Sequence, residues 1–387
     1  MRPDGGDIVK SMHANPTQAP VRHGAMRAQN LGLVLGEVAR GGPLTRAALA
    51  ELTGLTKTTV SRLVADLLDA GLVSEAPAVP GGERGRPGVE VSLSGDRVAA
   101  LGLEVNVAYL AACVVDLTRR VRVRKVIHRD NRAERPEDVL AALRALGDDA
   151  CAAASGLLVA GTVLAVPGPV GKGRVHNAPN LGWRDVDVAA LFGRPVTVEN
   201  EANMAALGEL EYGGAPSDFL YVSGETGVGA GLVSGGALFR GVTGVAGELG
   251  HVSVASDGPP CRCGATGCLE VHAGRDALPS QDALASGDPS ALDACRRAGR
   301  ALGVALSSAV NLLDPGTIVL GGVYAPLFPW LAPAVEEVLA ERLASLRPEL
   351  PALTASTTGP DAAVLGAAGQ VLQRVIAEPA AYARSTA

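Results

Sequence analysis

Apolar residues recur at helical spacing near the start of the chain and predict three consecutive helices. The first covers residues 26–40, where apolar positions three and four apart fall on one face. Thr45 is placed to cap a short helix that runs through Leu52, and Thr56 is placed to cap another that runs to Ala70. Gly54 between these two helices favours a sharp turn, so the pattern predicts a helix-turn-helix.

The second helix of this pair has one apolar face and one polar face. Its apolar face carries Val60, Leu63, Val64, Leu67 and Leu68, and its polar face carries Lys57, Thr58, Ser61 and Arg62. Two short apolar strands, at 72–74 and 89–93, then flank a loop rich in glycine, proline and arginine at 80–88. This is the pattern of a β-hairpin wing. Residues 26–93 therefore predict a winged helix-turn-helix.

From Val98 onward the pattern alternates between strands and helices. Strands are expected at 98–103, 109–115, 156–166, 195–199, 218–223, 228–234 and 317–320, with helices near 136–153, 201–212 and 291–313. Such alternation predicts an α/β architecture. The domains expected along the chain are a disordered tail at 1–25, the winged domain at 26–95, an α/β body at 96–378 and a tail at 379–387.

Composition and charge narrow the class of protein. With 387 residues, 47% hydrophobic and 19% charged, the chain is too apolar for a mainly disordered protein. Its start lacks the apolar run of a signal peptide, so we expect a soluble, cytoplasmic protein without a membrane partner. The net charge of -6 argues against a nucleic-acid partner only as an average, because residues 22–62 hold six basic and two acidic side chains.

The basic segment coincides with the helix-turn-helix and predicts a DNA-reading surface. Lys57, Thr58, Ser61 and Arg62 are suited to base edges in a major groove, and Thr56 and Arg46 to phosphates. Arg84 and Arg86 of the wing are suited to a minor groove. The alternatives are an ordinary helical hairpin with a solvated face, and a solvated flexible loop in place of a wing.

A cluster of cysteines predicts a metal site. Cys261, Cys263 and Cys268 lie within eight residues, and His251 precedes them. Three thiolates and one imidazole complete a closed tetrahedral zinc site, and such a site is structural because no position remains for water. The alternative is free cysteines beside an unrelated histidine.

Amide and carboxylate side chains gather around glycine-rich turns in the body. They lie in the segments that contain Asn180, Glu199 to Asn203, Gly247 to His251, and Glu270. Such groups pair with hydroxyl donors and acceptors, as a neutral polyol requires. Each segment alone is a weak signal.

Together these segments resemble the ROK family, named for repressors, uncharacterised reading frames and sugar kinases, and within it the transcriptional regulators of the xylose-repressor type. The resemblance covers about Gln29 to Gln370. The segments that carry it are 46–62, 85–87, 198–209, 226–232, the Gly-Glu-Leu-Gly-His sequence at 247–251, the Cys-x-Cys-Gly-x-x-Gly-Cys-Leu-Glu sequence at 261–270, and 319–322. The paired His and Cys sequences are specific, whereas the glycine strings are not.

The resemblance implies a two-lobed, actin-like sugar-kinase body of the ribonuclease H-like ATPase fold, with a structural Zn²⁺ and a sugar in the cleft. It assigns sugar contacts to Asn180, Asn200, Glu201, Glu248, His251 and Glu270. His251 would bind zinc through one ring nitrogen and a sugar hydroxyl through the other, so that zinc fixes a wall of the pocket.

Two positions separate a kinase from a regulator. Family kinases carry a Gly-x-Asp-x-Gly-Gly-Thr phosphate loop, whereas residues 102–108 place Asn106 and Val107 at the two glycine positions and Ala108 at the threonine. A β-branched valine resists the required turn, so we expect phosphate binding to be lost. At the position of the kinase's catalytic Asp stands Glu201, whose extra methylene shifts the carboxylate by about 1 Å.

The sequence therefore predicts a regulator without enzymatic activity, with Glu201 as a vestigial base. It would be a sugar-responsive repressor that binds operator DNA as a homodimer or homotetramer, with a monosaccharide or sugar phosphate as effector. The alternative is an active sugar kinase of the hexokinase or glucokinase type in which Glu201 is the general base. The identity of the sugar, and whether it releases or promotes DNA binding, are left open.

Overall fold

The computed structural model describes residues 23–77, 89–132 and 134–383, and they divide into two compact units. The first unit comprises the described residues up to 70, those within 75–92, and those from 376 onward, while the second comprises 71–74 and 93–375. Residues 1–22 of the expected amino-terminal tail lie outside the described residues, as do Arg84 and Arg86 of the predicted wing.

The first unit is built on three helices, α1 (His23–Gly41), α2 (Arg46–Thr53) and α3 (Lys57–Asp69). The two predicted caps are present, because the Thr45 side chain accepts from the Ala48 amide and the Thr56 side chain from the Thr59 amide, both at 3.2 Å. Gly54 ends α2 with a φ of +68°, which glycine adopts without strain. The predicted helix-turn-helix is confirmed.

A small sheet completes the first unit, in the order β1 (Leu44–Thr45), β3 (Val89–Leu93) and β2 (Val73–Pro77). Within the expected carboxyl-terminal tail, a short helix α12 (Ala380–Ala383) contacts both α1 and α3. At Gly32 of α1 a β-carbon would lie 2.4 Å from the carbonyl oxygen of Ala377, so the backbone at Ala377 packs directly against α1.

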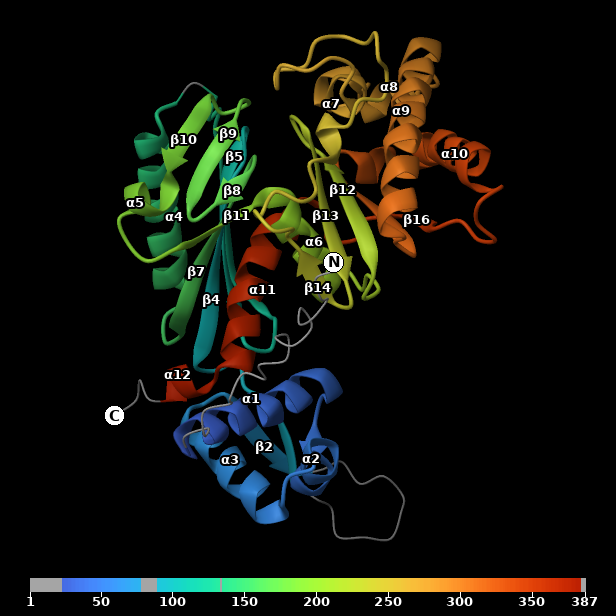
Figure 1. Ribbon diagram of the computed structural model, residues 1–387. Helices are drawn as coiled ribbons and strands as arrows, with labels where there is room; N and C mark the ends of the chain where they lie inside the picture. Colours follow the sequence, from blue (N-terminus) through green and yellow to red (C-terminus); the bar gives the residue numbers. More distant parts are fainter. Residues whose placement is uncertain (1–22, 78–88, 133, 384–387) are drawn as a thin grey trace, which may run out of the picture. The chain divides into compact units, whose positions relative to one another are not determined.

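The second unit contains two five-stranded sheets with the same strand order. In the first, three antiparallel strands, β4 (Val98–Val105), β5 (Tyr109–Asp116) and β6 (Val121–His128), are followed by the parallel strands β7 (Leu158–Val166) and β11 (Thr197–Asn200), in the order β6-β5-β4-β7-β11. In the second, β12 (Phe219–Gly224), β13 (Val228–Ser234) and β14 (Ala237–Phe239) are followed by β15 (Thr317–Gly322) and β16 (Ala352–Ala355), in the order β14-β13-β12-β15-β16. The unit is thus a topological duplication of two lobes (Figure 1).

Helices fill the connections in both lobes. The first lobe has α4 (Pro136–Ala153) between β6 and β7, the small strands β8 (Val170–Gly171), β9 (Arg174–Ala178) and β10 (Trp183–Asp187), and α5 (Val188–Phe192), and α6 (Glu201–Tyr212) follows β11. The second has α7 (Leu269–Ala273), α8 (Gln281–Ala285) and α9 (Pro289–Leu313) before β15, then α10 (Tyr324–Leu343), and α11 (Ala362–Ala377) follows β16. The predicted helices and strands are present, with ends shifted by a few residues.

The helix that follows each sheet packs against the other lobe. Helix α6 contacts β12 and β13 of the second sheet, and α11 lies along β4 of the first sheet (Figure 1), where a β-carbon on Gly102 would be 2.1 Å from the Val364 carbonyl oxygen. The two helices meet through glycines, since a β-carbon on Gly208 would lie 2.0 Å from the Ala362 oxygen. The two lobes therefore meet at a close crossing of α6 and α11.

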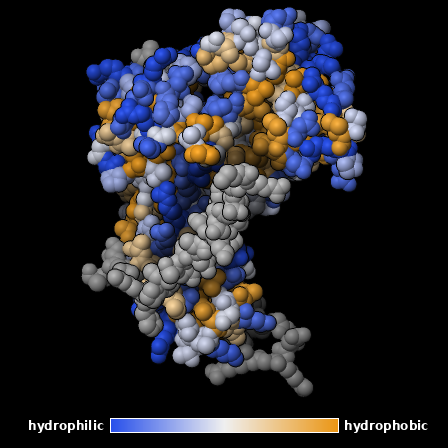
Figure 2. Space-filling model, viewed as in Figure 1, coloured by the Kyte–Doolittle hydropathy of each residue, from blue (hydrophilic) through white to orange (hydrophobic). Residues whose placement is uncertain are grey.

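Each lobe has its own aliphatic core, one around Leu101, Leu103 and Leu140, the other around Leu302, Leu306 and Ile318. On the visible face of the molecule, hydrophilic and hydrophobic residues are interspersed (Figure 2). Within the described part of the chain, no helix is both long and apolar enough to cross a bilayer.

Candidate functional site

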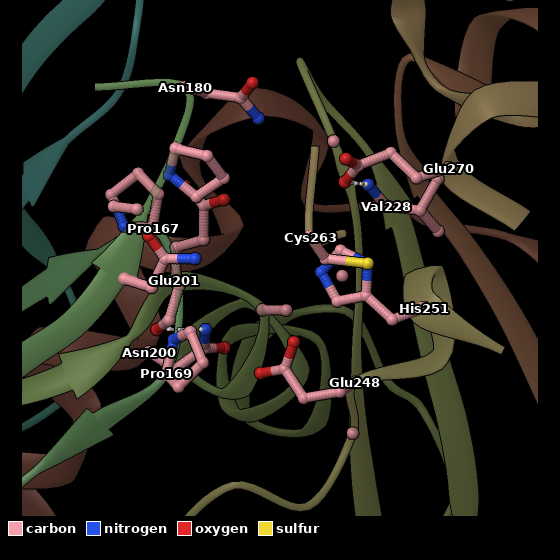
Figure 3. Close-up of a pocket in the computed structure, with 18 of the residues that line it drawn as sticks. Pro167, Pro169, Asn180, Asn200, Glu201, Val228, Glu248, His251, Cys263 and Glu270 are labelled. Atoms are coloured by element: carbon pink, nitrogen blue, oxygen red, sulfur yellow. Dashed lines mark hydrogen bonds between the residues drawn. The ribbon is translucent and has the colours of Figure 1, made fainter. Parts of the chain in front are cut away.

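A cavity of about 230 Å³ opens between the two lobes of the second unit. Its lining brings together all six residues that the sequence comparison with the ROK pattern assigned to a sugar: Asn180, Asn200, Glu201, Glu248, His251 and Glu270. Figure 3 shows them on two facing walls, with Asn180, Asn200 and Glu201 on one side and Glu248, His251 and Glu270 on the other.

The first wall is formed where strands of the first lobe end. Asn180 lies in the turn between β9 and β10, and Asn200 ends β11. The Asn200 side chain is already engaged, because its oxygen caps α6 by accepting from the Asn203 amide at 3.1 Å and its nitrogen donates to the Gly168 carbonyl at 2.9 Å. Glu201, the first residue of α6, is held in place by this cap.

The second wall depends on glycines that let side chains approach the sheet. Gly247 has a φ of +104°, and a β-carbon there would lie 2.3 Å from the Ala230 carbonyl oxygen, so only glycine fits before Glu248. Glu270, in the first turn of α7, accepts from the Val228 amide at 3.3 Å. A β-carbon on Gly227 would lie 2.4 Å from the Glu270 carboxylate, so a side chain here would displace that carboxylate from its present position.

The cavity is polar and acidic. Burial raises the pKa of Glu201 well above its usual value, and the nearby Glu225 and Glu104 carboxyls raise it further. Burial also raises the pKa of Glu248, which His251 opposes and Glu270 reinforces. Protonated carboxyls both donate and accept hydrogen bonds. Among the described lining residues, His251 is the one side chain that can carry a positive charge.

The four predicted metal ligands converge at the second wall, where His251 and Cys263 also line the cavity. The ligand atoms of His251, Cys261, Cys263 and Cys268 all lie within 4.8 Å of one another. The Cys263 and Cys268 sulfurs are 3.7 Å apart, and His251 Nδ1 is 3.8 Å from the Cys261 sulfur. Two thiolates on a common tetrahedral zinc, each at about 2.3 Å from it, stand roughly 3.7 Å apart. The donor set and its spacing fit a tetrahedral ion, and Nδ1 is the nitrogen that faces it.

Several residues of the site were not identified from the sequence. Pro167, Gly168, Pro169 and Asn177 line the first wall, and the Pro-Gly-Pro sequence after β7 was the signal that could have identified them. Arg262, between two cysteines, donates from Nη1 to Asn180 Oδ1 at 2.5 Å, a hydrogen bond between the two lobes.

Beside the cavity, a second group of carboxyls lies between the segments that form phosphate loops in family kinases. Glu104 of β4 is 3% exposed and accepts a hydrogen bond of 2.7 Å from the Tyr109 hydroxyl. Asn106 bonds the carboxylate of Glu225, and its own oxygen accepts from the Ala108 amide at 3.1 Å. Burial raises the pKa of Glu104 to about 8, despite the Tyr109 hydrogen bond, and the neighbouring Glu225 adds to the effect.

On the first unit, α3 presents the residues predicted to read DNA. Thr56, Lys57, Thr58 and Arg62 are exposed and Ser61 is partly exposed, whereas Val60, Leu63, Val64 and Leu67 are buried. Arg46 is less free than the sequence implied, because its guanidinium is paired with Glu75 at 2.8 Å. It can reach a phosphate only if that ion pair is shared or broken.

Comparison with known proteins agrees with this arrangement. The sequence model of the ROK family matches residues 100–374, and that of the MarR family matches residues 32–85. The xylose repressor of Bacillus spizizenii is 29% identical over 370 residues, which cover 90% of this chain and 96% of the repressor.

Two solved structures are similar as well. The crystal structure of a ROK family transcriptional regulator, a homologue of the E. coli MLC protein, matches with a TM-score of 0.75 at 26% identity, over 91% of this chain and 97% of that chain. A ROK hexokinase from Thermus thermophilus matches with a TM-score of 0.58 at 32% identity, over 70% of this chain and 97% of the hexokinase chain. Since the ROK match spans well over half of its residues, the chain belongs to the ROK family.

Proposed function

We propose that this protein is a sugar-responsive DNA-binding repressor whose kinase-like unit binds a monosaccharide. The observation that carries the proposal is the presence, in one chain, of a helix-turn-helix and a cavity lined by amides and carboxyls between two lobes. The similarity to a xylose repressor over 90% of the chain supports the same combination. The similarity to the Thermus thermophilus hexokinase, by contrast, extends over 70% of this chain.

The DNA-binding role rests on the exposed polar face of α3. Lys57, Thr58, Ser61 and Arg62 would read base edges, with Thr56 and Arg46 at phosphates. A helix-turn-helix protein commonly binds as a dimer to two half-sites about 34 Å apart. A homodimer or homotetramer of this chain would supply such a pair.

The effector that best suits the cavity is a neutral monosaccharide. Glu201, Glu248 and Glu270 would exchange hydrogen bonds with its hydroxyls, together with Asn180, Asn200 and His251. A phosphate group would find no Lys or Arg among the described lining residues to balance its charge. The name of the Bacillus spizizenii relative makes D-xylose the first sugar to test.

The metal that suits the four donors is a structural Zn²⁺. It would be held by His251, Cys261, Cys263 and Cys268. With Nδ1 of His251 on the metal side, Nε2 is left to meet a sugar hydroxyl in the cavity, so the ion would fix the orientation of the ring.

The alternative, an active ROK sugar kinase with Glu201 as general base, is less consistent with residues 102–108. Glu104 stands at the position of the kinase Asp, and Asn106 replaces a glycine. Asn106 forms a turn through its own side chain and bonds Glu225, which brings a carboxylate to the place where the phosphate loops of a kinase would meet ATP.

The proposal is tested by footprinting on the upstream region of the protein's own gene. The purified protein should protect a site, and D-xylose or another sugar that raises its melting temperature should change that protection. No protected site with or without sugars would refute the regulator. Sugar-dependent ATP turnover that disappears in Glu201→Ala would establish the kinase instead.

A further inference from the structure

One partly buried carboxylate lies where three segments of the second unit meet. Glu199 Oε1 accepts from Arg240 Nη2 at 3.0 Å and from Gln370 Nε2 at 2.9 Å. The Glu199 side chain is 15% exposed, and Gln370 is 9% exposed. Because a buried polar group that loses its partner costs free energy, the three side chains are expected to remain bonded and their segments to move together.

Two of these segments carry the two walls of the cavity. Glu199 directly precedes Asn200, which caps α6 and thereby places Glu201. Arg240 opens the loop that leads to Glu248, and the Ala246 amide closes that loop by donating to the Arg240 carbonyl at 3.2 Å. A movement of either wall is therefore transmitted to the Glu199 carboxylate within a few residues.

The third segment leads away from the cavity. Gln370 lies in α11, a continuous helix that ends at Ala377. Its last two residues, Ile376 and Ala377, belong to the first unit, the one that contains the helix-turn-helix. Gln370 and Ile376 are six residues apart, about 9 Å along the helix. A helix of this length moves as one body, so a displacement at Gln370 reaches Ile376.

We propose that Glu199, Arg240 and Gln370 form a coupling junction that reports the state of the sugar cavity to α11 and so to the DNA-binding unit. None of the three side chains is needed to hold the sugar or to read DNA. Closing of the lobes on a sugar would change the distance between the segments that carry Glu199 and Arg240. Gln370 would move with the Glu199 carboxylate to which it donates a hydrogen bond. This proposal rests on the function proposed above.

The test is the ratio of operator affinities without and with sugar, measured by fluorescence anisotropy with a labelled fragment from the upstream region and D-xylose, or whichever monosaccharide stabilises the protein. The wild type should show a ratio of at least about fivefold, the lower end of typical allosteric coupling. Gln370→Met preserves side-chain length but cannot donate to Glu199. It should keep sugar affinity and sugar-free operator affinity within about threefold of wild type, while the ratio falls below about twofold.

Gln373→Met is the matched control. Gln373 lies one turn further along α11 and donates to Glu211 of α6, away from both cavity walls. This variant should retain the wild-type ratio. Arg240→Met, which removes the other donor at a partly exposed position, should reproduce the loss seen in Gln370→Met and serves in its place if that variant does not fold.

A wild-type ratio in Gln370→Met and Arg240→Met would overturn the junction, as would an equal loss in Gln373→Met, which would point to general loosening of α11. Failure of the proposed function has a different signature, because the wild type itself would then show no sugar-dependent change.

Discussion

Replacement of Glu104 by Gln should abolish a loss of stability that the second unit undergoes as the pH rises. Burial raises the pKa of Glu104 from 4.5 to about 8, so the folded protein keeps a proton that the unfolded chain releases above pH 4.5. The stability contributed by this group is therefore fully present below about pH 4.5 and is lost as the pH rises through about 8. Gln has the same shape, cannot ionise, and can still accept from the Tyr109 hydroxyl.

The magnitude follows from the two pKa values. At about 1.4 kcal/mol per pKa unit, the interval from 4.5 to about 8 corresponds to roughly 5 kcal/mol at most. Because Glu104 is only 3% exposed, solvent screening reduces this little. We expect the unfolding free energy of Glu104→Gln, relative to wild type, to rise by several kcal/mol between pH 5 and pH 9.

Tryptophan fluorescence during urea unfolding is the suitable assay. Both tryptophans of the chain, Trp183 and Trp330, lie in the second unit, so the signal reports that unit alone. Curves of unfolding free energy against pH that run parallel for wild type and Glu104→Gln would refute the reasoning, since Glu104 would then titrate normally in the folded protein.

Three further tests concern the fold, the proposed metal centre and the proposed DNA surface. Gly366→Ala would place a β-carbon 1.8 Å from the Met204 carbonyl oxygen and should lower the fluorescence-detected unfolding midpoint strongly, whereas Gly316→Ala, which meets nothing within 4 Å, should not; equal midpoints would contradict the close helix crossing. Cys263→Ser should release zinc, measured by elemental analysis, and weaken sugar binding in calorimetry, and unchanged sugar affinity would refute a shared role for His251. Lys57→Ala with Arg62→Ala should weaken operator binding by at least tenfold while sugar-induced thermal shifts persist, and loss of both would indicate misfolding instead.

The sequence predicted the local features because single residues determine them. Thr45 and Thr56 cap the helices that follow them, and the amphipathic pattern of α3 alone distinguishes its buried and exposed faces. The six cavity residues come together because the fold implied by the family resemblance places the ends of strands and glycine turns at one cleft. The resemblance, rather than spacing, carried that part of the prediction.

Other features depend on contacts that leave no periodic signal. Strand β6 was not predicted, because it is an edge strand in which arginines alternate with valines. The Glu199–Gln370 hydrogen bond joins residues 171 positions apart, and the Asn106–Glu225 bond joins two lobes. The duplicated strand order is likewise visible only once the strands are paired. Such partners are determined by tertiary packing and not by neighbouring residues.

The proposed regulator couples a sugar to an operator and performs no chemistry on the sugar. This coupling is tested most directly by titrating the purified protein into a labelled upstream fragment at fixed salt, with and without the stabilising sugar, and by assaying the same preparation for ATP turnover. We expect a sugar-dependent change in operator affinity of at least about fivefold and no sugar-dependent ATP turnover. Operator affinity that ignores every sugar, together with ATP turnover abolished in Glu201→Ala, would contradict it.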